Sequence, residues 1–176
     1  MINALGDIMR KIIKNAIQCK LCGDTIESTD RHQYVTCKCG ACAADGGHDY
    51  LRRSFKNKDC YTDLSVTVPL TEYKIQRLSA LFNPTTTLAD TFYETLEDIE
   101  AIKYHYYDYM TTAPINADEE LKRLPSADYD LCCALITMLL REDHFSNGSF
   151  GERFENGDVS PIVEKMIALL KESTED

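Results

Sequence analysis

Two pairs of cysteines near the start of the chain have the residue types and spacing of a metal site. Cys19 and Cys22 form a Cys-x-x-Cys pair, Cys37 and Cys39 form a Cys-x-Cys pair, and a glycine follows each pair. Thiolates are preferred ligands of zinc, and four of them close a tetrahedral coordination sphere with no position left for water. We therefore predict a structural zinc site on two short turns, where the metal contributes to the folding of a small module.

Further cysteines and histidines leave the ligand set open. Cys42 lies three residues after Cys39 and could replace it, while Cys60, His32 and His48 could substitute for a ligand or donate to one. Six of the eight cysteines fall within the first 60 residues. This distribution favours metal binding in a reducing compartment over a secreted disulfide framework.

A second group of polar side chains lies between residues 140 and 153. The candidate ligand-binding residues of this segment are Arg141, His144, Ser146, Asn147, Ser149 and Arg153. Arginine and histidine bind anionic oxygens, and asparagine can recognise the edge of a base or a ribose. A capped helix end explains the same residues, because His144 favours a helix C-terminus and Ser-Asn-Gly-Ser forms a turn. Both interpretations stay open from the sequence.

Tyrosines are concentrated between residues 104 and 109. On a helix, Tyr104 and Tyr107 share one face, and their rings would suit stacking on a base or on a peptide. Half-buried packing explains them equally well. The chain contains no Gly-x-Ser-x-Gly, Gly-x-x-x-x-Gly-Lys or His-Glu-x-x-His motif. Asp143, His144 and Ser146 are too close in one turn to assemble a catalytic triad, so we assign no catalytic residues.

The charge is distributed unevenly along the chain. Residues 1–60 carry ten Lys and Arg against seven Asp and Glu, a net charge of +3, and residues 61–176 carry nine against 22, a net charge of −13. An acidic body repels phosphate backbones, so duplex nucleic acid is an unfavourable partner for it. No apolar run approaches membrane-spanning length and no signal peptide is visible, which predicts a cytoplasmic protein without a membrane partner.

The periodicity of apolar residues predicts an α+β protein in three parts. Residues 1–15 form an amphipathic helix, residues 16–70 a small zinc ribbon with short β-hairpins, and residues 71–176 a mainly helical domain. Alternation over 64–68 predicts a strand. Within the third part we expect helices over about 71–82, 95–110, 117–123 and 126–142. A final helix is predicted with Ser160 as its N-cap and Pro161 at its first position.

Two stretches of the chain resemble known families. The sequence Leu-Leu-Arg-Glu-Asp-His-Phe-Ser-Asn-Gly-Ser-Phe, with Arg153 and the Ser160-Pro161 helix after it, resembles an uncharacterised bacterial and phage domain family over about residues 75–170. Residues 17–53, with both cysteine pairs, resemble a small zinc-ribbon module of phage and firmicute proteins. The resemblance implies a phage or mobile-element protein in the bacterial cytoplasm.

These observations lead us to expect a binding protein that captures a small anionic ligand, plausibly a host signalling nucleotide, without turning it over. Such a protein would act against a bacterial defence, and a pocket shared between subunits would make it a homodimer. Two alternatives stay open: a protein-interaction module that uses the acidic body, and a nucleotide hydrolase or nuclease that uses His144 as general base.

Overall fold

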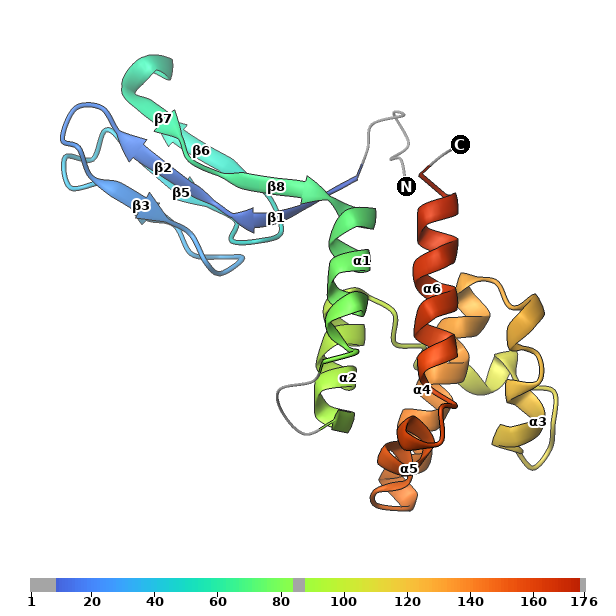
Figure 1. The fold of residues 1–176 in the computed structure, drawn as a ribbon. Helices are drawn as coiled ribbons and strands as arrows, with labels where there is room; N and C mark the ends of the chain where they lie inside the picture. Colours follow the sequence, from blue (N-terminus) through green and yellow to red (C-terminus); the bar gives the residue numbers. More distant parts are fainter. Residues whose placement is uncertain (1–8, 84–87, 175–176) are drawn as a thin grey trace. The chain divides into compact units, whose positions relative to one another are not determined.

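The chain folds into two compact units, Met1–Glu72 and Tyr73–Asp176. The computed structural model describes residues 9–83 and 88–174 (Figure 1). The first unit consists of short strands and the second of helices, which confirms the α+β class and the order of the ribbon and the helical domain. Each unit is described by itself below.

The described residues of the first unit, 9–72, form eight strands. They are β1 (Arg10–Lys14), β2 (Ala16–Cys19), β3 (Thr25–Glu27), β4 (Val35–Thr36), β5 (Cys42–Asp45), β6 (Arg52–Phe55), β7 (Tyr61–Asp63) and β8 (Val66–Pro69), with a 3₁₀ turn η1 (Lys58–Cys60) before β7. All pairings are antiparallel and give a two-stranded ribbon β1-β8 and two three-stranded sheets, β3-β2-β7 and β4-β5-β6. Such short sheets bury little apolar surface, so the unit needs further stabilising interactions.

The amphipathic helix predicted for the start of the chain is wrong over Arg10–Lys14. That segment is strand β1, paired with β8 in a register that sets Lys11 opposite Val68. Tertiary pairing overrides the local helical pattern here, because the strand predicted over 64–68 offers its backbone groups to this segment. The remainder of the predicted helix, residues 2–8, lies outside the described residues.

A buried asparagine connects β2 with β5 and β6, at the end of β2 that lies away from the cysteines. Asn15 is fully buried, and its Nδ2 donates to the carbonyl oxygens of Asp45 (3.1 Å), Gly47 (2.8 Å) and Tyr50 (3.2 Å). Its Oδ1 accepts a 2.7 Å bond from the guanidinium of Arg53. The network satisfies carbonyls that the turn after β5 would otherwise leave unpaired.

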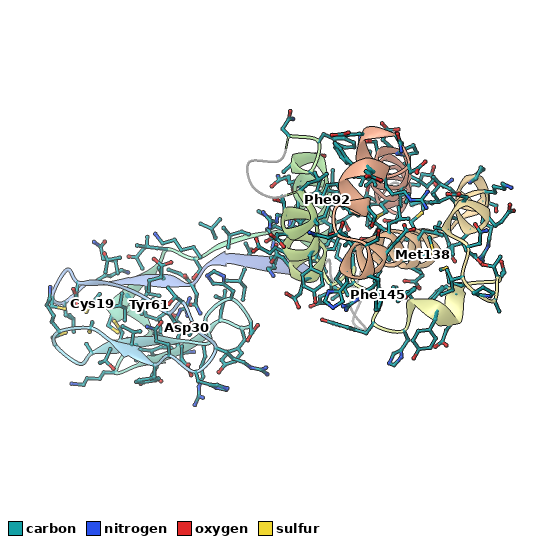
Figure 2. All side chains as sticks on the ribbon, turned by 90° about the horizontal axis from the view of Figure 1, so that it is seen from below. Cys19, Asp30, Tyr61, Phe92, Met138 and Phe145 are labelled. Atoms are coloured by element: carbon teal, nitrogen blue, oxygen red, sulfur yellow. The ribbon has the colours of Figure 1, made fainter. Side chains whose placement is uncertain are left out.

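The second unit is helical around one apolar core. Its elements are α1 (Leu70–Ala80, which begins in the first unit), α2 (Leu88–Asp98), α3 (Ala117–Leu121), α4 (Tyr129–Phe145), α5 (Ser149–Glu155) and α6 (Ser160–Glu172), with 3₁₀ turns η2 (Tyr106–Tyr109) and η3 (Leu124–Ser126). The central helix is α4, which is buried continuously from Cys132 to Leu139, as its apolar sequence predicted. Phe92 of α2 meets Phe150 of α5 edge to face at 5.0 Å between ring centroids (Figure 2).

Several helix boundaries differ from the sequence prediction. The helix expected over 126–142 is α4, which begins at Tyr129 with Asp128 as its N-cap and ends at Phe145. The helix expected over 95–110 is wrong: α2 ends at Asp98, and residues 106–109 form only the 3₁₀ turn η2. The chain breaks at Glu100, which adopts a positive φ of 57° and so cannot continue a right-handed helix. The last helix includes Ser160 as its first residue, so that its N-cap is Val159 and not Ser160. Within the described part of the chain, none of the helices has the length and apolar character needed to span a membrane.

Candidate functional site

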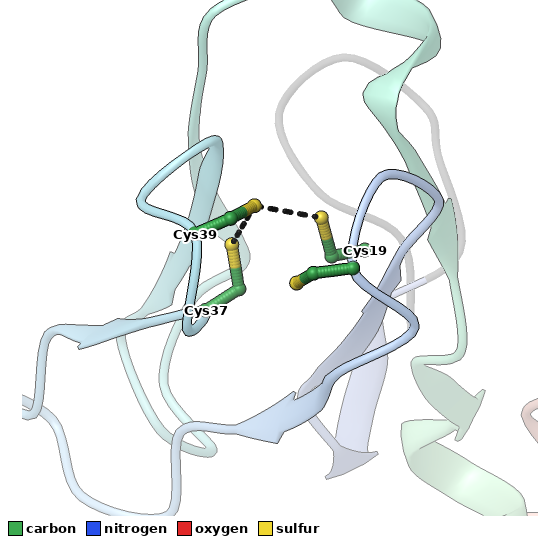
Figure 3. Close-up of side chains that lie close together, drawn as sticks. Cys19, Cys37 and Cys39 are labelled. Carbon is green, nitrogen blue, oxygen red and sulfur yellow. Dashed lines mark hydrogen bonds between the residues drawn. The ribbon is translucent and has the colours of Figure 1, made fainter.

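The four cysteines predicted as metal ligands converge in the first unit. Their sulfurs all lie within 4.8 Å of one another, and they form the one group of potential metal ligands found among the described residues. The Sγ of Cys39 is 3.7 Å from that of Cys19 and 3.6 Å from that of Cys37. Figure 3 marks both contacts with dashed lines. Tetrahedral zinc with bonds of about 2.3 Å would separate its sulfur ligands by about 3.8 Å. The cluster therefore fits a structural metal ion of zinc's size.

Local backbone turns hold the sulfurs in place. The N–H of Gly23 donates to the carbonyl of Cys19 (2.8 Å), and the N–H of Gly40 donates to that of Cys37 (2.9 Å). Both glycines have positive φ, 74° and 67°, a conformation that glycine adopts without the steric cost of a side chain. Each Cys pair is thus presented on one tight turn, with Cys19 and Cys37 buried and Cys22 and Cys39 exposed.

Cys42 supports the cluster from its backbone and lies outside the set of four. Its N–H donates to the Sγ of Cys37 at 3.4 Å, and its own side chain is buried. Burial opposes ionisation of Cys37, but this bond and the neighbouring thiols outweigh it and lower the pKa of Cys37 to about 6. Since the thiolate is the form that binds a metal, Cys37 is favoured in its ligating state. For Cys39 a bond from the backbone of Ala41 favours ionisation, but the neighbouring thiols outweigh it and raise the pKa of Cys39 to about 12. Of the alternatives left open by the sequence, the geometry selects Cys39 over Cys42.

The second unit contains a cleft of about 180 Å³ between α2 and α4, and two of the predicted ligand-binding residues line it. Arg141 and His144 come from the last turns of α4. The lining also includes Thr137, Tyr93 and the carboxylates of Asp90 and Asp143. The cleft therefore combines cationic donors with acceptors, and it suits a ligand that has both an acidic group and hydroxyl or amino donors.

The guanidinium of Arg141 is available to bind a ligand in the cleft. Its guanidinium carbon lies 6.0 Å from the centroid of the Tyr93 ring, the limit of a cation–π contact. Among the described residues, no carboxylate forms an ion pair with Arg141. A half-buried guanidinium without a carboxylate partner is an attractive position for an anion.

The side-chain carboxylate of Asp143 holds the turn after α4 through hydrogen bonds with backbone N–H groups. The Oδ1 of Asp143 accepts hydrogen bonds from the N–H groups of Gly148 (3.0 Å) and Phe150 (2.9 Å), and Gly148 has a φ of 94°. These bonds satisfy backbone N–H groups at the start of α5, and they do not involve His144. Asn147 is exposed in this turn and Ser149 begins α5, and neither lines the cleft.

Arg153 is engaged by carboxylates of its own chain. Its guanidinium contacts Asp118, Glu142 (3.2 Å) and Asp158 (3.1 Å). The hydrogen bonds that Arg153 donates to these carboxylates raise its pKa, and its guanidinium connects α3, α4 and the loop before α6. Its charge is already neutralised, so we do not retain it among the ligand donors.

Tyr104 and Tyr107, which the sequence suggested as stacking faces, are exposed and do not line the cleft. The hydroxyl of Tyr104 lies 3.3 Å from a carboxylate oxygen of Glu97, and that of Tyr107 lies 2.6 Å from the Nδ1 of His105. Because η2 is a 3₁₀ turn, the shared α-helical face predicted for them does not form. The aromatic ring beside Arg141 is Tyr93 instead.

Comparison with known families divides the chain in nearly the same way as the fold. Residues 11–55 match a family model described as a domain of unknown function, DUF7695, and residues 76–172 match one described as a family of unknown function, DUF6508. The chain belongs to the DUF6508 family. The cysteine cluster lies in the DUF7695 match, and both walls of the cleft lie in the DUF6508 match. No curated protein and no solved structure gives a match.

Sequence reasoning missed the α2 wall of the DUF6508 cleft. Asp90 and Tyr93 lie on one face of a helix that was predicted to begin only at residue 95, so their convergence on Arg141 was hidden. The amphipathic repeat Leu88, Phe92, Thr95 and Leu96 was the available signal, since it fixes which side of α2 faces the core.

Proposed function

We propose that the DUF6508 unit captures a small anionic ligand in the cleft between α2 and α4. The guanidinium of Arg141 and the imidazole of His144 bind the acidic group, and Tyr93 supplies an aromatic face. The observation that carries the proposal is that Arg141 lines this cleft without a carboxylate partner among the described residues. Asp90 and the second oxygen of Asp143 then accept from hydroxyl or amino groups, which nucleotides possess.

The volume of the cleft limits the ligand. Pockets that enclose whole drug-sized ligands hold about 300–1,000 Å³, whereas this cleft holds about 180 Å³. It therefore encloses one end of a nucleotide, and the remainder of the ligand stays at the surface. A signalling nucleotide of a bacterial host is the class that this chemistry and the phage resemblance together favour, and its capture without turnover would oppose a host defence. The homodimer expected from the sequence stays a prediction.

We also propose zinc as the metal of the cysteine cluster. The support is the all-sulfur donor set and the spacing of the sulfurs. Cys19, Cys22, Cys37 and Cys39 would hold the ion and leave it no open position, so its contribution is to the stability of the ribbon.

The ligand proposal is tested by thermal denaturation of the full chain with cyclic nucleotides, linear nucleotides and inorganic phosphate. A bound probe at ten times its Kd adds about 1.4 kcal/mol, which raises the Tm of a unit of this size by about 5–10 °C. Arg141→Ala removes a charge-assisted contact and should weaken binding by about 10- to 100-fold. Lys171→Ala, an exposed cation on α6, is the matched control and should bind as the wild type does.

Two results would contradict this function. If none of the probes raises the Tm, the cleft does not bind this class of ligand. If chromatography shows that a probe is consumed, and His144→Ala stops its consumption while the Tm is retained, the protein is a hydrolase and does not simply capture its ligand.

A further inference from the structure

A second hollow lies beside the α2 cleft along α4, since Arg141 lines both, and it has a different character. It holds about 290 Å³, and its lining includes Tyr106, Ile115, Met138 and Phe145, with Arg141, Glu142 and Ser146 beside them. Met138 is buried, whereas 87% of Phe145 and 41% of Ile115 are exposed to solvent. Figure 2 marks Met138 and Phe145 on the helical unit.

The exposure of Phe145 has no explanation within the unit. Phe145 is the last residue of α4 and the most exposed of the large apolar side chains among the described residues. Leaving it in water forfeits about 2 kcal/mol that its burial would provide. The α5 phenylalanines Phe150 and Phe154 pack against Phe92, so the core of the unit is closed without Phe145.

The hollow belongs to an acidic unit, and its own lining holds one cation, Arg141, and one carboxylate, Glu142. Glu142 lines it, and Asp118 follows the lining residue Ala117. These two carboxylates and Asp158 share the single guanidinium of Arg153, so the group of four retains a net charge of −2. Arg141 offsets one charge, but residues 73–176 carry nine Lys and Arg against 20 Asp and Glu, a net charge of −11. A basic partner would be attracted from a distance and held at the border.

From these observations, we propose that this hollow is a docking site for a basic segment of another protein. The segment inserts one large apolar side chain between Phe145, Ile115 and Met138, and its flanking lysines or arginines pair with Glu142 and Asp118. A second copy of this chain suits the site less, because two bodies of charge −11 repel each other. This site shares Arg141 with the α2 cleft, but the apolar residues that it uses do not line that cleft.

The test uses the full chain and three labelled peptides of about 15 residues, with binding followed by fluorescence anisotropy. One peptide has a central leucine flanked by Lys and Arg, the second has the same leucine flanked by Glu, and the third has alanine in place of leucine with the basic flanks kept. At about 0.15 M salt we expect binding of the first peptide, with at least about tenfold weaker binding of the other two.

Phe145→Ser and Ile115→Ser decide whether the apolar hollow is the site. Each should weaken binding of the first peptide by about tenfold or more, while the thermal response to a nucleotide probe bound at the α2 cleft stays unchanged. Because both side chains are exposed, the variants should keep the wild-type Tm in the absence of peptide. Lys171→Ala is again the matched control and leaves peptide binding unaltered.

Three results would overturn the inference. Binding of the basic peptide that is insensitive to Phe145→Ser means that only diffuse charge attracts it. Equal binding of the acidic peptide removes the role of the border carboxylates. Sedimentation that shows a dimer of the wild-type chain and a monomer of Phe145→Ser means that a second copy covers this face.

Discussion

At the scale of the residue, the surroundings of a side chain decide what its chemistry can do. Arg141 and Arg153 lie 12 positions apart and are the same residue type. Arg153 is clamped by Asp118, Glu142 and Asp158, whereas Arg141 lies near Tyr93 and lines two hollows. A guanidinium surrounded by three carboxylates joins elements of the fold, and one without a carboxylate partner can bind an anion.

A buried carboxylate should control the response of the helical unit to acid. Glu120 is fully buried, and its Oε1 accepts from the N–H groups of Thr111 and Thr112, both at 2.7 Å, while Arg123 bonds its Oε2. Burial opposes its ionisation, but these bonds outweigh that effect and lower its pKa from 4.5 to about 2. The stability that the carboxylate supplies is therefore present above about pH 4.5 and is lost as the pH falls towards 2.

Glu120→Gln should accordingly be less stable than the wild type by about 2 kcal/mol at pH 7, with a smaller difference at pH 3. Urea denaturation followed by circular dichroism at both pH values measures this. Glu119→Gln, an exposed partner of Lys122, is the control and should change stability by less than about 0.5 kcal/mol. A Glu120→Gln deficit that is the same at both pH values would contradict the assignment.

At the scale of the element, local patterns predict an element well only where its own residues determine it. The apolar run of α4 was predicted from the sequence, because its apolar character matches the burial that it adopts. The strand predicted over 64–68 forms as β8 (Val66–Pro69), but Leu64 and Val66 are exposed, so its alternation does not follow burial. The segment Arg10–Lys14 was not, since its pairing with β8 involves residues more than 50 positions away. The same holds for α2, whose start was placed too late and which ends at the positive φ of Glu100.

The turn after β5 should tolerate no side chain at its first glycine. Gly46 has a φ of 105°, and a Cβ there would lie 2.2 Å from the carbonyl oxygen of Tyr50. Gly46→Ala should thus cost about 3 kcal/mol or more, since it adds an overpacking cost to the backbone strain. Gly148 has a similar φ of 94° with nothing near its Cβ position, so Gly148→Ala should cost only about 1–2 kcal/mol.

Urea denaturation followed by tyrosine fluorescence compares the two variants, since the chain contains no tryptophan. If Gly46→Ala costs no more than Gly148→Ala, the close approach of Tyr50 does not constrain the turn.

At the scale of the whole molecule, the two units rely on different sources of stability. Among the residues that the structure describes, the helical unit has a core of 19 buried apolar residues, and the ribbon has a cluster of eight, half of which are cysteines. The apolar contribution of the ribbon is small, so its fold depends on the sulfur cluster and on the network of Asn15.

Removal of the metal should therefore unfold one unit and spare the other. After treatment with a zinc chelator, amides of residues 16–63 should lose protection from hydrogen exchange, while those of α4 and α6 keep theirs. Cys39→Ser should produce the same pattern and retain no zinc, whereas Cys42→Ser should bind one zinc per chain. A chelator that leaves the ribbon amides protected would show that the metal is dispensable for this fold.

The sequence by itself determined the order of the ribbon and the helical unit and the position of the central helix. It also determined the cysteine ligands, except for the choice between Cys39 and Cys42. Each of these depends on residue type, short spacing or one-element periodicity, which are local properties. The tertiary structure decided which arginine is available, which tyrosine faces it, where β1 pairs and which phenylalanine stays in water. Those outcomes depend on side chains that are distant in sequence and meet only when the chain folds, so no local pattern encodes them.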